Sequence, residues 1–292
     1  MSNVKTITEK FRPVDLSRLT SLLTEFEEKS LGEKTQIIDE LVAAHAVLSV
    51  DWREGWRFKR ARKVSNGNFE HVQDILWPPH SLASAGRANS PGHPVMYLAD
   101  RTDTALKEIR VLEEEEVVLA EFSIRGGKRC RFLPIGEMLY IHRTGHGRLL
   151  KDGGLPLNGI LNACRYEEAQ AYLITDHFLT KVLEDDVEPY VLSSYLCNAL
   201  FKKCPDVSAI AYPSARQIGA MNFAVQTEDF WKSWGVASVS KFYAKHLAAG
   251  FYARRNRANV TGIYKSGRLL WDEEILGSRT TTLLHPLWVP SV

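Results

Sequence analysis

The 292-residue sequence lacks the signature motifs of several large enzyme classes. It contains no GxxxxGK[ST] loop and no GxGxxG turn between a strand and a helix, which argues against P-loop nucleotide hydrolases and Rossmann dinucleotide-binding domains. It also contains no GxSxG elbow and no HExxH helix, which argues against serine α/β-hydrolases and zinc metalloproteases. Any catalytic site must therefore be built from a less familiar combination of residues.

Cysteine is also scarce, with residues only at positions 130, 164, 197 and 204. No two of them form a CxxC pair, and no His/Cys spacing matches a zinc site. We therefore expect free thiols in a reduced compartment and no metal.

Neither a membrane nor a nucleic acid is indicated as a direct partner. No apolar run reaches the ~18 residues that a membrane-spanning helix requires, and the polar N-terminal residues contain no apolar signal core. The net charge of +2 is too small to indicate bulk nucleic-acid binding. We expect a cytoplasmic protein without a membrane contact.

Hydrophobic periodicity changes at about residue 54. Before it, the segments LSRLTSLLTEFEEKS and TQIIDELVAAHAVL carry apolar residues at helical spacing and predict two amphipathic helices joined at SLGEK. After it, strand and helix patterns are mixed without regular alternation, which favours a mixed or mostly antiparallel sheet. We expect an α+β fold, with a helical extension over residues 1–54 and the main domain over residues 55–292.

The main domain contains segments with clear strand or helix patterns. Helix 103–115 should begin at an N-cap on Thr102 or Asp103, and the basic tail 241–271 should hold one helix and one or two strands. Further strands are expected at 94–99, 116–124, 129–135 and 207–213, and further helices at 166–185 and 189–204.

The loop GRANSPG is the first candidate binding segment. Gly86 and Gly92 bracket it, so Arg87 projects from a tightly turned backbone. The planar fork of arginine suits two-point contact with phosphate or carboxylate. Upstream, Arg60 belongs to the expected strand in WRFKRARK, and beside Arg87 it would complete a clamp for a diphosphate.

Four further side chains could bind a ligand or stabilise charge on it. Tyr97 closes the expected strand PVMYLA, where its ring could stack on a planar group of a ligand. Glu108, in the second turn of the next helix, could accept hydrogen bonds from ribose or stabilise positive charge on a sugar carbon. Ser214 follows a buried strand that a proline and a glycine interrupt, so it should lie at a sheet rim, and Asn222 comes after the glycine. Taken singly, such residues are more often a surface charge, a core aromatic or a turn.

Taken in order, these pieces resemble the RES-domain family, which is named for an arginine, a glutamate and a serine. The resemblance extends over residues 56–225, and the matching segments are FKRAR, PP, GRANSPG, VMYLAD, TALKEIR, VVLAEF and AIAYPS…GAMNFAV. It implies that Arg87, Glu108 and Ser214 are the family's three residues and that Tyr97 is an aromatic residue of the site.

The resemblance leaves the first arginine open. Arg60 is one candidate, but Ala61 follows it where some members carry an aromatic residue, and Arg57, which precedes Phe58, is the alternative. Asn222 would hydrogen-bond the nicotinamide amide or the ribose together with the serine.

The resemblance further implies a fold similar to ADP-ribosyltransferases and NAD⁺ as the substrate. Family members are typically toxins of toxin–antitoxin pairs, which degrade NAD⁺ by hydrolysis or phosphorolysis. The implied partner is an antitoxin that blocks the NAD⁺ site, and the antitoxin rather than this chain would contact DNA.

Two other functions and the oligomeric state stay open at this point. An ADP-ribosyltransferase would pass ADP-ribose to a protein or nucleic acid, and the basic tail would then help to dock the target. A non-catalytic module would bind a nucleotide or a partner and leave NAD⁺ unchanged. A homo-oligomer is compatible with either.

Overall fold

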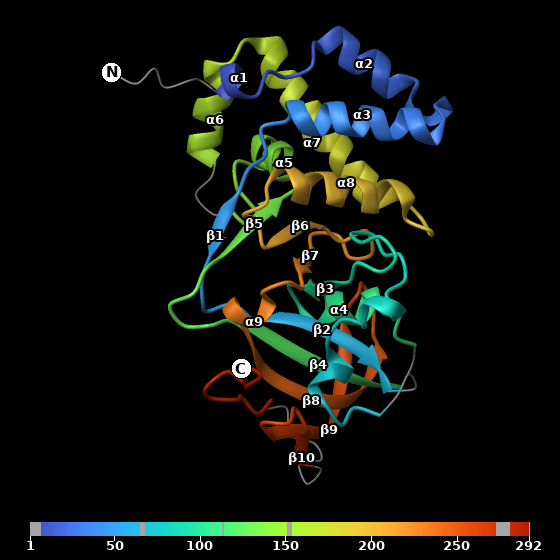
Figure 1. The fold of residues 1–292 in the computed structure, drawn as a ribbon, viewed down its shortest axis with the longest axis vertical. Helices are drawn as coiled ribbons and strands as arrows, with labels where there is room; N and C mark the ends of the chain where they lie inside the picture. Colours follow the sequence, from blue (N-terminus) through green and yellow to red (C-terminus); the bar gives the residue numbers. More distant parts are fainter. Residues whose placement is uncertain (1–6, 65–67, 113, 151–153, 273–280, 292) are drawn as a thin grey trace. The chain divides into compact units, whose positions relative to one another are not determined.

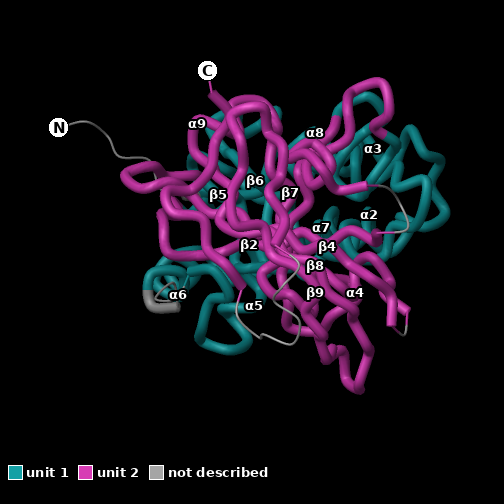
Figure 2. Tube along the Cα trace, turned by 90° about the horizontal axis from the view of Figure 1, so that it is seen from below, with its two compact units in different colours: residues 1–50, 84–93, 131–213 teal, residues 51–83, 94–130, 214–292 magenta. Residues whose placement is uncertain are grey.

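The computed structural model describes residues 7–64, 68–112, 114–150, 154–272 and 281–291. Helices are combined with strands that pair in parallel as well as antiparallel fashion, so the fold is α+β, as the sequence predicts (Figure 1). Two compact units interleave along the chain. Unit 1 holds residues 1–50, 84–93 and 131–213, and unit 2 holds residues 51–83, 94–130 and 214–292 (Figure 2).

The two N-terminal helices of unit 1 begin at residues that cap them. Helix α2 (Leu16–Thr24) follows Asp15, whose carboxylate accepts hydrogen bonds from two backbone N–H groups of the first turn. Helix α3 (Leu31–Ala44) follows a capping box, in which Ser30 and Glu33 each bond the backbone N–H of the other. Both helices confirm the expectation from hydrophobic spacing.

The rest of unit 1 is mainly helical. Strands β5 and β6 pair in parallel, with Leu133 opposite Ile210. Helices α7 and α8 confirm the helices expected near the same positions. The remaining elements are α1 (Ile7–Lys10), the 3-10 turn η1 (Phe26–Glu28), β5 (Cys130–Pro134), α5 (Glu137–Thr144), α6 (Gly154–Ala163), α7 (Tyr166–Asp185), α8 (Val191–Lys203) and β6 (Ala209–Pro213).

Unit 2 is built on antiparallel strands in the order β7-β3-β2-β4-β8-β9-β10. Its elements are β2 (Phe58–Lys63), the 3-10 turns η3 (Val72–Ile75) and η4 (His80–Leu82), β3 (Val95–Ala99), α4 (Thr102–Glu108), β4 (Glu115–Ile124), β7 (Met221–Gln226), α9 (Phe230–Ser233), β8 (Trp234–His246), β9 (Tyr252–Ile263) and β10 (Leu269–Asp272). The short strand β1 (Val50–Trp52) lies in the chain where unit 1 passes into unit 2.

Helix α4 packs against the strands of unit 2 through its apolar side. Leu106 is fully buried in a cluster with Ala61 on β2, Leu119 on β4 and Phe242 on β8. Because this packing fixes the helix, it also fixes the position of Glu108, the last residue of the helix.

Two details of the predicted helix are wrong. The helix begins at Thr102 with Arg101 as its N-cap and without a side-chain capping bond, so neither Thr102 nor Asp103 is the N-cap. It also ends at Glu108 instead of extending to residue 115, because Arg110 has a positive φ of 51° and strand β4 takes up the residues from Glu115 onward.

The prediction for the basic tail is wrong in one respect. The described residues between positions 241 and 271 form strands and turns but no helix. On β8, Phe242 and Ala244 are buried whereas Lys241 and Tyr243 are partly exposed. This alternation has the period of a strand, so the pairing of β8 with β4 and β9 overrides the helical propensity of the alanines and lysines.

Truncation of Leu106 tests whether this core holds α4. Leu106→Ala should lower the free energy of unfolding by about 2–5 kcal/mol, because a fully buried leucine is replaced by a cavity. Urea denaturation followed by tryptophan fluorescence is suitable, since all seven tryptophans belong to the segments of unit 2.

Leu112→Ala is the matched control, because Leu112 is 66% exposed and follows the same helix. It should change the free energy of unfolding by less than about 0.5 kcal/mol. Equal effects of the two substitutions would contradict the packing described for α4.

Candidate active site

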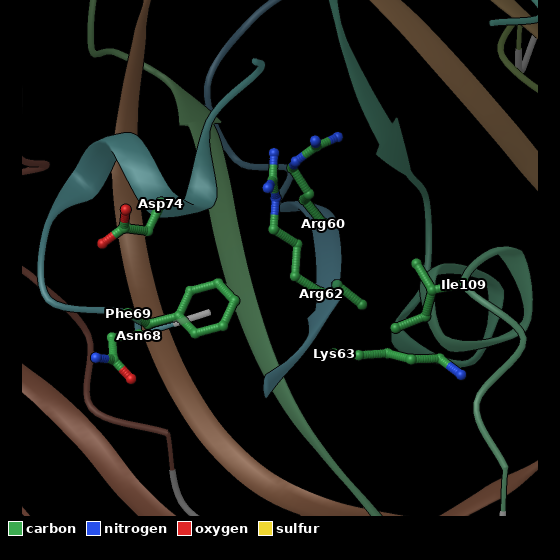
Figure 3. A pocket seen from close by; sticks show the side chains of 8 residues that line it. Arg60, Arg62, Lys63, Asn68, Phe69, Asp74 and Ile109 are labelled. Atoms are coloured by element: carbon green, nitrogen blue, oxygen red, sulfur yellow. The ribbon is translucent and has the colours of Figure 1, made fainter. Parts of the chain in front are cut away.

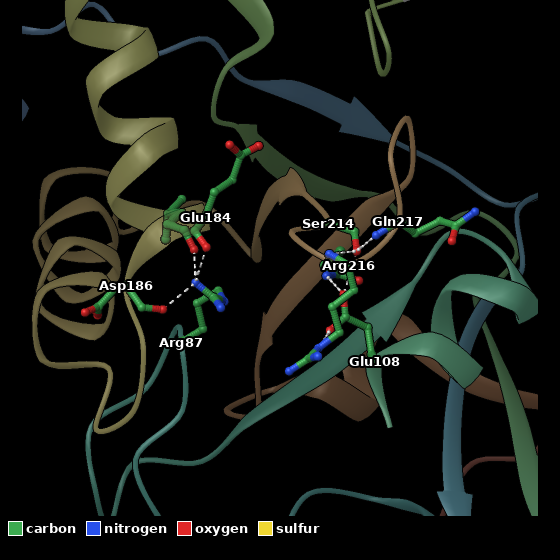
Figure 4. Close-up of polar contacts among 9 residues, drawn as sticks. Arg87, Glu108, Glu184, Asp186, Ser214, Arg216 and Gln217 are labelled. Atoms are coloured by element: carbon green, nitrogen blue, oxygen red, sulfur yellow. Dashed lines mark hydrogen bonds and ion pairs between the residues drawn. The ribbon is translucent and has the colours of Figure 1, made fainter. Parts of the chain in front are cut away.

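The carboxylate of Glu108 is the centre of a hydrogen-bonded group in unit 2. Its Oε1 atom accepts hydrogen bonds from Ser214 Oγ and from Asn222 Nδ2, each at 2.6 Å. Its Oε2 atom lies 3.3 Å from Arg216 Nε. Short bonds of this kind are typical of donors to an ionised acceptor and orient the carboxylate (Figure 4).

Ser214 is held in place by the backbone of its own loop. Its Oγ accepts hydrogen bonds from the N–H groups of Arg216, at 3.1 Å, and Gln217, at 3.0 Å, while it donates to Glu108. The Ser214 N–H donates to the carbonyl of Ala220, which closes the loop. These bonds fix the hydroxyl as a donor to the carboxylate and thereby orient the carboxylate.

The loop that contains Ser214 rests on a glycine. Gly250 has a positive φ of 81°, and a Cβ at this position would collide with the side chain of Gln217. Only glycine adopts this conformation readily and leaves the space free. Gly250 thus supports the loop from the connection between β8 and β9.

Asn222 reaches Glu108 from the strand β7. It pairs with Ala99, the last residue of β3, and α4 begins three residues later at Thr102. The register of β3 and β7 thus brings the end of α4 and the start of β7 together. Asn222 is 8% exposed and Ser214 is 7% exposed, so both donors are shielded from water.

Arg216 belongs to the group although the sequence reasoning missed it. Its side chain and that of Glu108 are 32% and 30% exposed, so solvent screens their attraction and the pair contributes less than about 1 kcal/mol to stability. The sequence could have indicated Arg216, because it comes two residues after Ser214 in a segment where a turn is expected. The pair keeps a positive charge next to the carboxylate.

Tyr97 and the two candidate first arginines also belong to unit 2. Arg60 donates hydrogen bonds to the carbonyls of Tyr97, at 3.1 Å, and Leu76, at 3.3 Å. Burial, and then the positive charge of Arg62, lowers the pKa of Arg60 to about 9. Arg57 is more exposed and forms an ion pair with a glutamate of β4 at 3.2 Å.

The strand position expected for Tyr97 is wrong. Tyr97 is the central residue of β3 and does not close the strand, which continues to Ala99 because both residues pair with β7. The side chain of Tyr97 is partly exposed.

Arg87 belongs to unit 1, where it binds the C-terminal end of α7. Its Nη1 donates hydrogen bonds to the carbonyls of Leu183, Glu184 at 3.2 Å and Asp186 at 3.0 Å (Figure 4). The guanidinium also lies over the ring of Tyr190, 5.1 Å from its centroid. The last carbonyls of a helix have no partner within it, so Arg87 caps α7 through Nη1.

The structure therefore brings Glu108, Ser214 and Asn222 into direct contact. Arg60 contacts the backbone of Tyr97 within the same unit, whereas Arg87 has its contacts in unit 1. The diphosphate clamp of Arg60 and Arg87 stays a prediction. Among the described residues, no group of three or more His, Cys, Asp or Glu side chains could hold a metal ion, and no helix is long and apolar enough to cross a membrane.

An α+β domain with an oriented, partly exposed carboxylate beside hydrogen-bond donors has the means to stabilise positive charge on a ligand. The family model of the RES domain matches residues 56–234, more than half of the chain. The protein therefore belongs to the RES domain family. No match to the chain is found among curated proteins. The family is associated with NAD-related enzymatic activity.

Replacement of Arg87 tests its capping role. Arg87→Ala should lower the free energy of unfolding by about 1–3 kcal/mol, because charged hydrogen bonds to three helix-terminal carbonyls are lost. Thermal or urea unfolding followed by circular dichroism at 222 nm measures this change.

Arg165→Ala is the control at the other end of the same helix. Arg165 is 78% exposed and pairs with Glu168, so solvent screens the pair and its loss should leave the unfolding midpoint nearly unchanged. A destabilisation of Arg87→Ala no larger than that of Arg165→Ala would argue against the capping role.

Proposed function

We propose that the protein is an NAD⁺-consuming enzyme that cleaves the bond between nicotinamide and ribose. The observation that carries the proposal is the Glu108 carboxylate, with Ser214 and Asn222 on the same oxygen at 2.6 Å. A carboxylate fixed in this way is suited to a cation that forms next to it, because its orientation need not change during the reaction. Membership of the RES domain family supports the choice of NAD⁺.

The chemistry is a heterolytic cleavage of the N-glycosidic bond. The bonding electron pair leaves with nicotinamide, which becomes neutral, and the ribose C1′ becomes cationic. The negative charge of Glu108 stabilises this cation. Water or inorganic phosphate then adds to C1′ and loses a proton, which gives ADP-ribose or its 1-phosphate.

The remaining residues have supporting roles in the proposal. Arg87, with Arg60 or Arg57, would hold the diphosphate, and Tyr97 would orient the nicotinamide ring. Asn222 and Ser214 hold the carboxylate in place and lie where the ribose or the nicotinamide amide could contact them. NAD⁺ is the substrate, and the proposal needs no metal.

A toxin function follows from the same proposal. Depletion of NAD⁺ would arrest growth, so the cell would need an inhibitor of this chain. We propose that the inhibitor is an antitoxin protein that blocks the site in the cytoplasm. The DNA contacts of such a pair would belong to the antitoxin.

A second candidate function is the transfer of ADP-ribose to a macromolecule. It is favoured by exposed arginines on β9: Arg254, Arg255 and Arg257. Arg255 and Arg257 lie over the ring of Tyr243, 4.9 and 5.8 Å from its centroid. NAD⁺ labelled in the adenylate distinguishes the candidates, because transfer leaves label in protein or nucleic acid and degradation leaves it in small products.

Glu108→Gln tests the proposal most simply. The substitution keeps the shape of the side chain and removes its charge, so NAD⁺ cleavage should fall at least about a hundredfold. The rate of nicotinamide release from purified protein measures the effect, and the midpoint of urea unfolding checks that the fold is intact.

Glu116→Gln is the matched control. Glu116 lies on β4, in the same unit, and its carboxylate pairs with Arg257 instead of Ser214 or Asn222. The Glu116→Gln variant should cleave NAD⁺ at the wild-type rate. If the Glu108→Gln variant also cleaved NAD⁺ at that rate, the role of Glu108 would be refuted. Binding of NAD⁺ without cleavage by the wild type would indicate a non-catalytic module.

A further inference from the structure

Strand β2 presents two arginines, Arg60 and Arg62, on the same side of the sheet. Arg60 donates to the carbonyls of Tyr97 and Leu76, and Arg62 donates to the same carbonyl of Leu76. The Nε atoms of both side chains are buried and have no hydrogen-bond partner. Neutral carbonyls therefore hold the two guanidinium groups, and some of their donors are unused.

Among the described residues, neither arginine has a carboxylate oxygen within 4.0 Å. Lys63, the next residue of β2, does have a carboxylate partner, because it forms an ion pair with Glu115 at 2.8 Å. Burial lowers the pKa of both arginines, and the charge of Arg62 lowers that of Arg60 further, whereas the charge of Asp74 acts in the opposite direction on the pKa of Arg62. The positive charge of the pair is thus incompletely balanced by the protein, which is costly unless an anion balances it.

These arginines line a cavity of about 440 Å³ in unit 2, shown in Figure 3. Its wall also contains Phe69, Asn68 and Asp74. The single carboxylate in this wall, that of Asp74, accepts hydrogen bonds from the N–H groups of Glu70, at 3.0 Å, and His71, at 2.8 Å. Asp74 thus caps its own turn, and its charge balances only part of that of Arg62, whose pKa is still lowered by burial.

The cavity adjoins the candidate active site along the chain. Ile109, which lines it, directly follows Glu108. Its volume is within the range of ~300–1,000 Å³ that small-molecule sites have, and it exceeds the space that a single phosphate needs. The ring of Phe69 adds an apolar wall beside the charged one (Figure 3).

We propose that this cavity is a phosphate-binding subsite whose ligand is a nucleotide. The phosphate oxygens would accept hydrogen bonds from the free donors of Arg62 and Arg60, since the guanidinium fork matches the geometry of phosphate. The base or sugar would lie against Phe69. The inference rests on the proposed function in one respect, namely that the nucleotide is the adenylate half of the substrate.

Calorimetric titration of the full chain with AMP tests the subsite. AMP should bind to the wild type, and Arg62→Gln should weaken this binding at least about tenfold, because a charged hydrogen bond to phosphate is lost. Arg62→Lys should lie between the two, since lysine keeps the charge but not the fork. Arg129→Gln is the control and should bind AMP like the wild type, because Arg129 lies in the same unit, is 67% exposed and pairs with Asp51.

Adenosine and inorganic phosphate complete the experiment. Adenosine lacks the phosphate, so its binding should be insensitive to Arg62→Gln. The subsite is refuted if AMP does not bind to the wild type, or if it binds equally well to Arg62→Gln. If inorganic phosphate binds in an Arg62-dependent manner and AMP binds no tighter, the nucleotide assignment is refuted.

The test of the subsite, AMP binding, can fail or succeed independently of the test of the proposed function, NAD⁺ cleavage. AMP binding does not require cleavage, so Glu108→Gln should bind AMP with wild-type affinity. If the wild type leaves NAD⁺ intact but binds AMP through Arg62, the proposed function fails and the subsite stands. If the wild type cleaves NAD⁺ and Arg62→Gln has an unchanged KM, the subsite does not serve the substrate.

Discussion

The hydrogen bonds from Ser214 and Asn222 to one oxygen of Glu108 are the constraint on which the site depends. They join three segments that are far apart in the sequence: the end of α4, the loop after β6 and the start of β7. The buried Leu106 anchors α4, and the register of β3 with β7 places Asn222. Ser214 and Asn222 fix one oxygen of the carboxylate and Arg216 pairs with the other, so the group is oriented in advance for the cation that the proposed reaction forms on a sugar.

Backbone carbonyls hold three of the arginines. Arg87 binds carbonyls at the end of α7, and Arg60 and Arg62 bind carbonyls within unit 2. Carbonyl groups fix the direction of a guanidinium without cancelling its charge, whereas a carboxylate partner would cancel it. Arg57 is the counterexample, because its ion pair with Glu121 already balances it. For this reason Arg60 is the better candidate for the first arginine.

Much of the fold could be predicted from local patterns. The capped helices α2 and α3, and helices α7 and α8, follow from apolar spacing, and the strands β3, β5 and β6 follow from short apolar runs. The tail was misjudged because a lysine- and alanine-rich segment favours a helix locally, whereas the pairing of β8 with β4 on one side and β9 on the other makes it a strand. The division of the chain at residue 54 stays a prediction.

The candidate site was predictable in part. The sequence order of Arg87, Glu108 and Ser214 indicated the family, and Asn222 was expected to act with the serine. That Ser214 and Asn222 share one oxygen of Glu108 depends on strand register, which no local pattern specifies. The Arg62 cavity was also hidden, because it exists only where Phe69 and Ile109 are folded next to β2.

A double-mutant cycle between Glu108 and Ser214 tests the central claim most directly. If Ser214 acts by orienting the Glu108 carboxylate, Ser214→Ala should lower kcat/KM for NAD⁺ in the wild type. In a Glu108→Asp background the shortened carboxylate no longer reaches the hydroxyl, so the same substitution should have little further effect. The account predicts this non-additivity. Full additivity of the two substitutions in kcat/KM would contradict it.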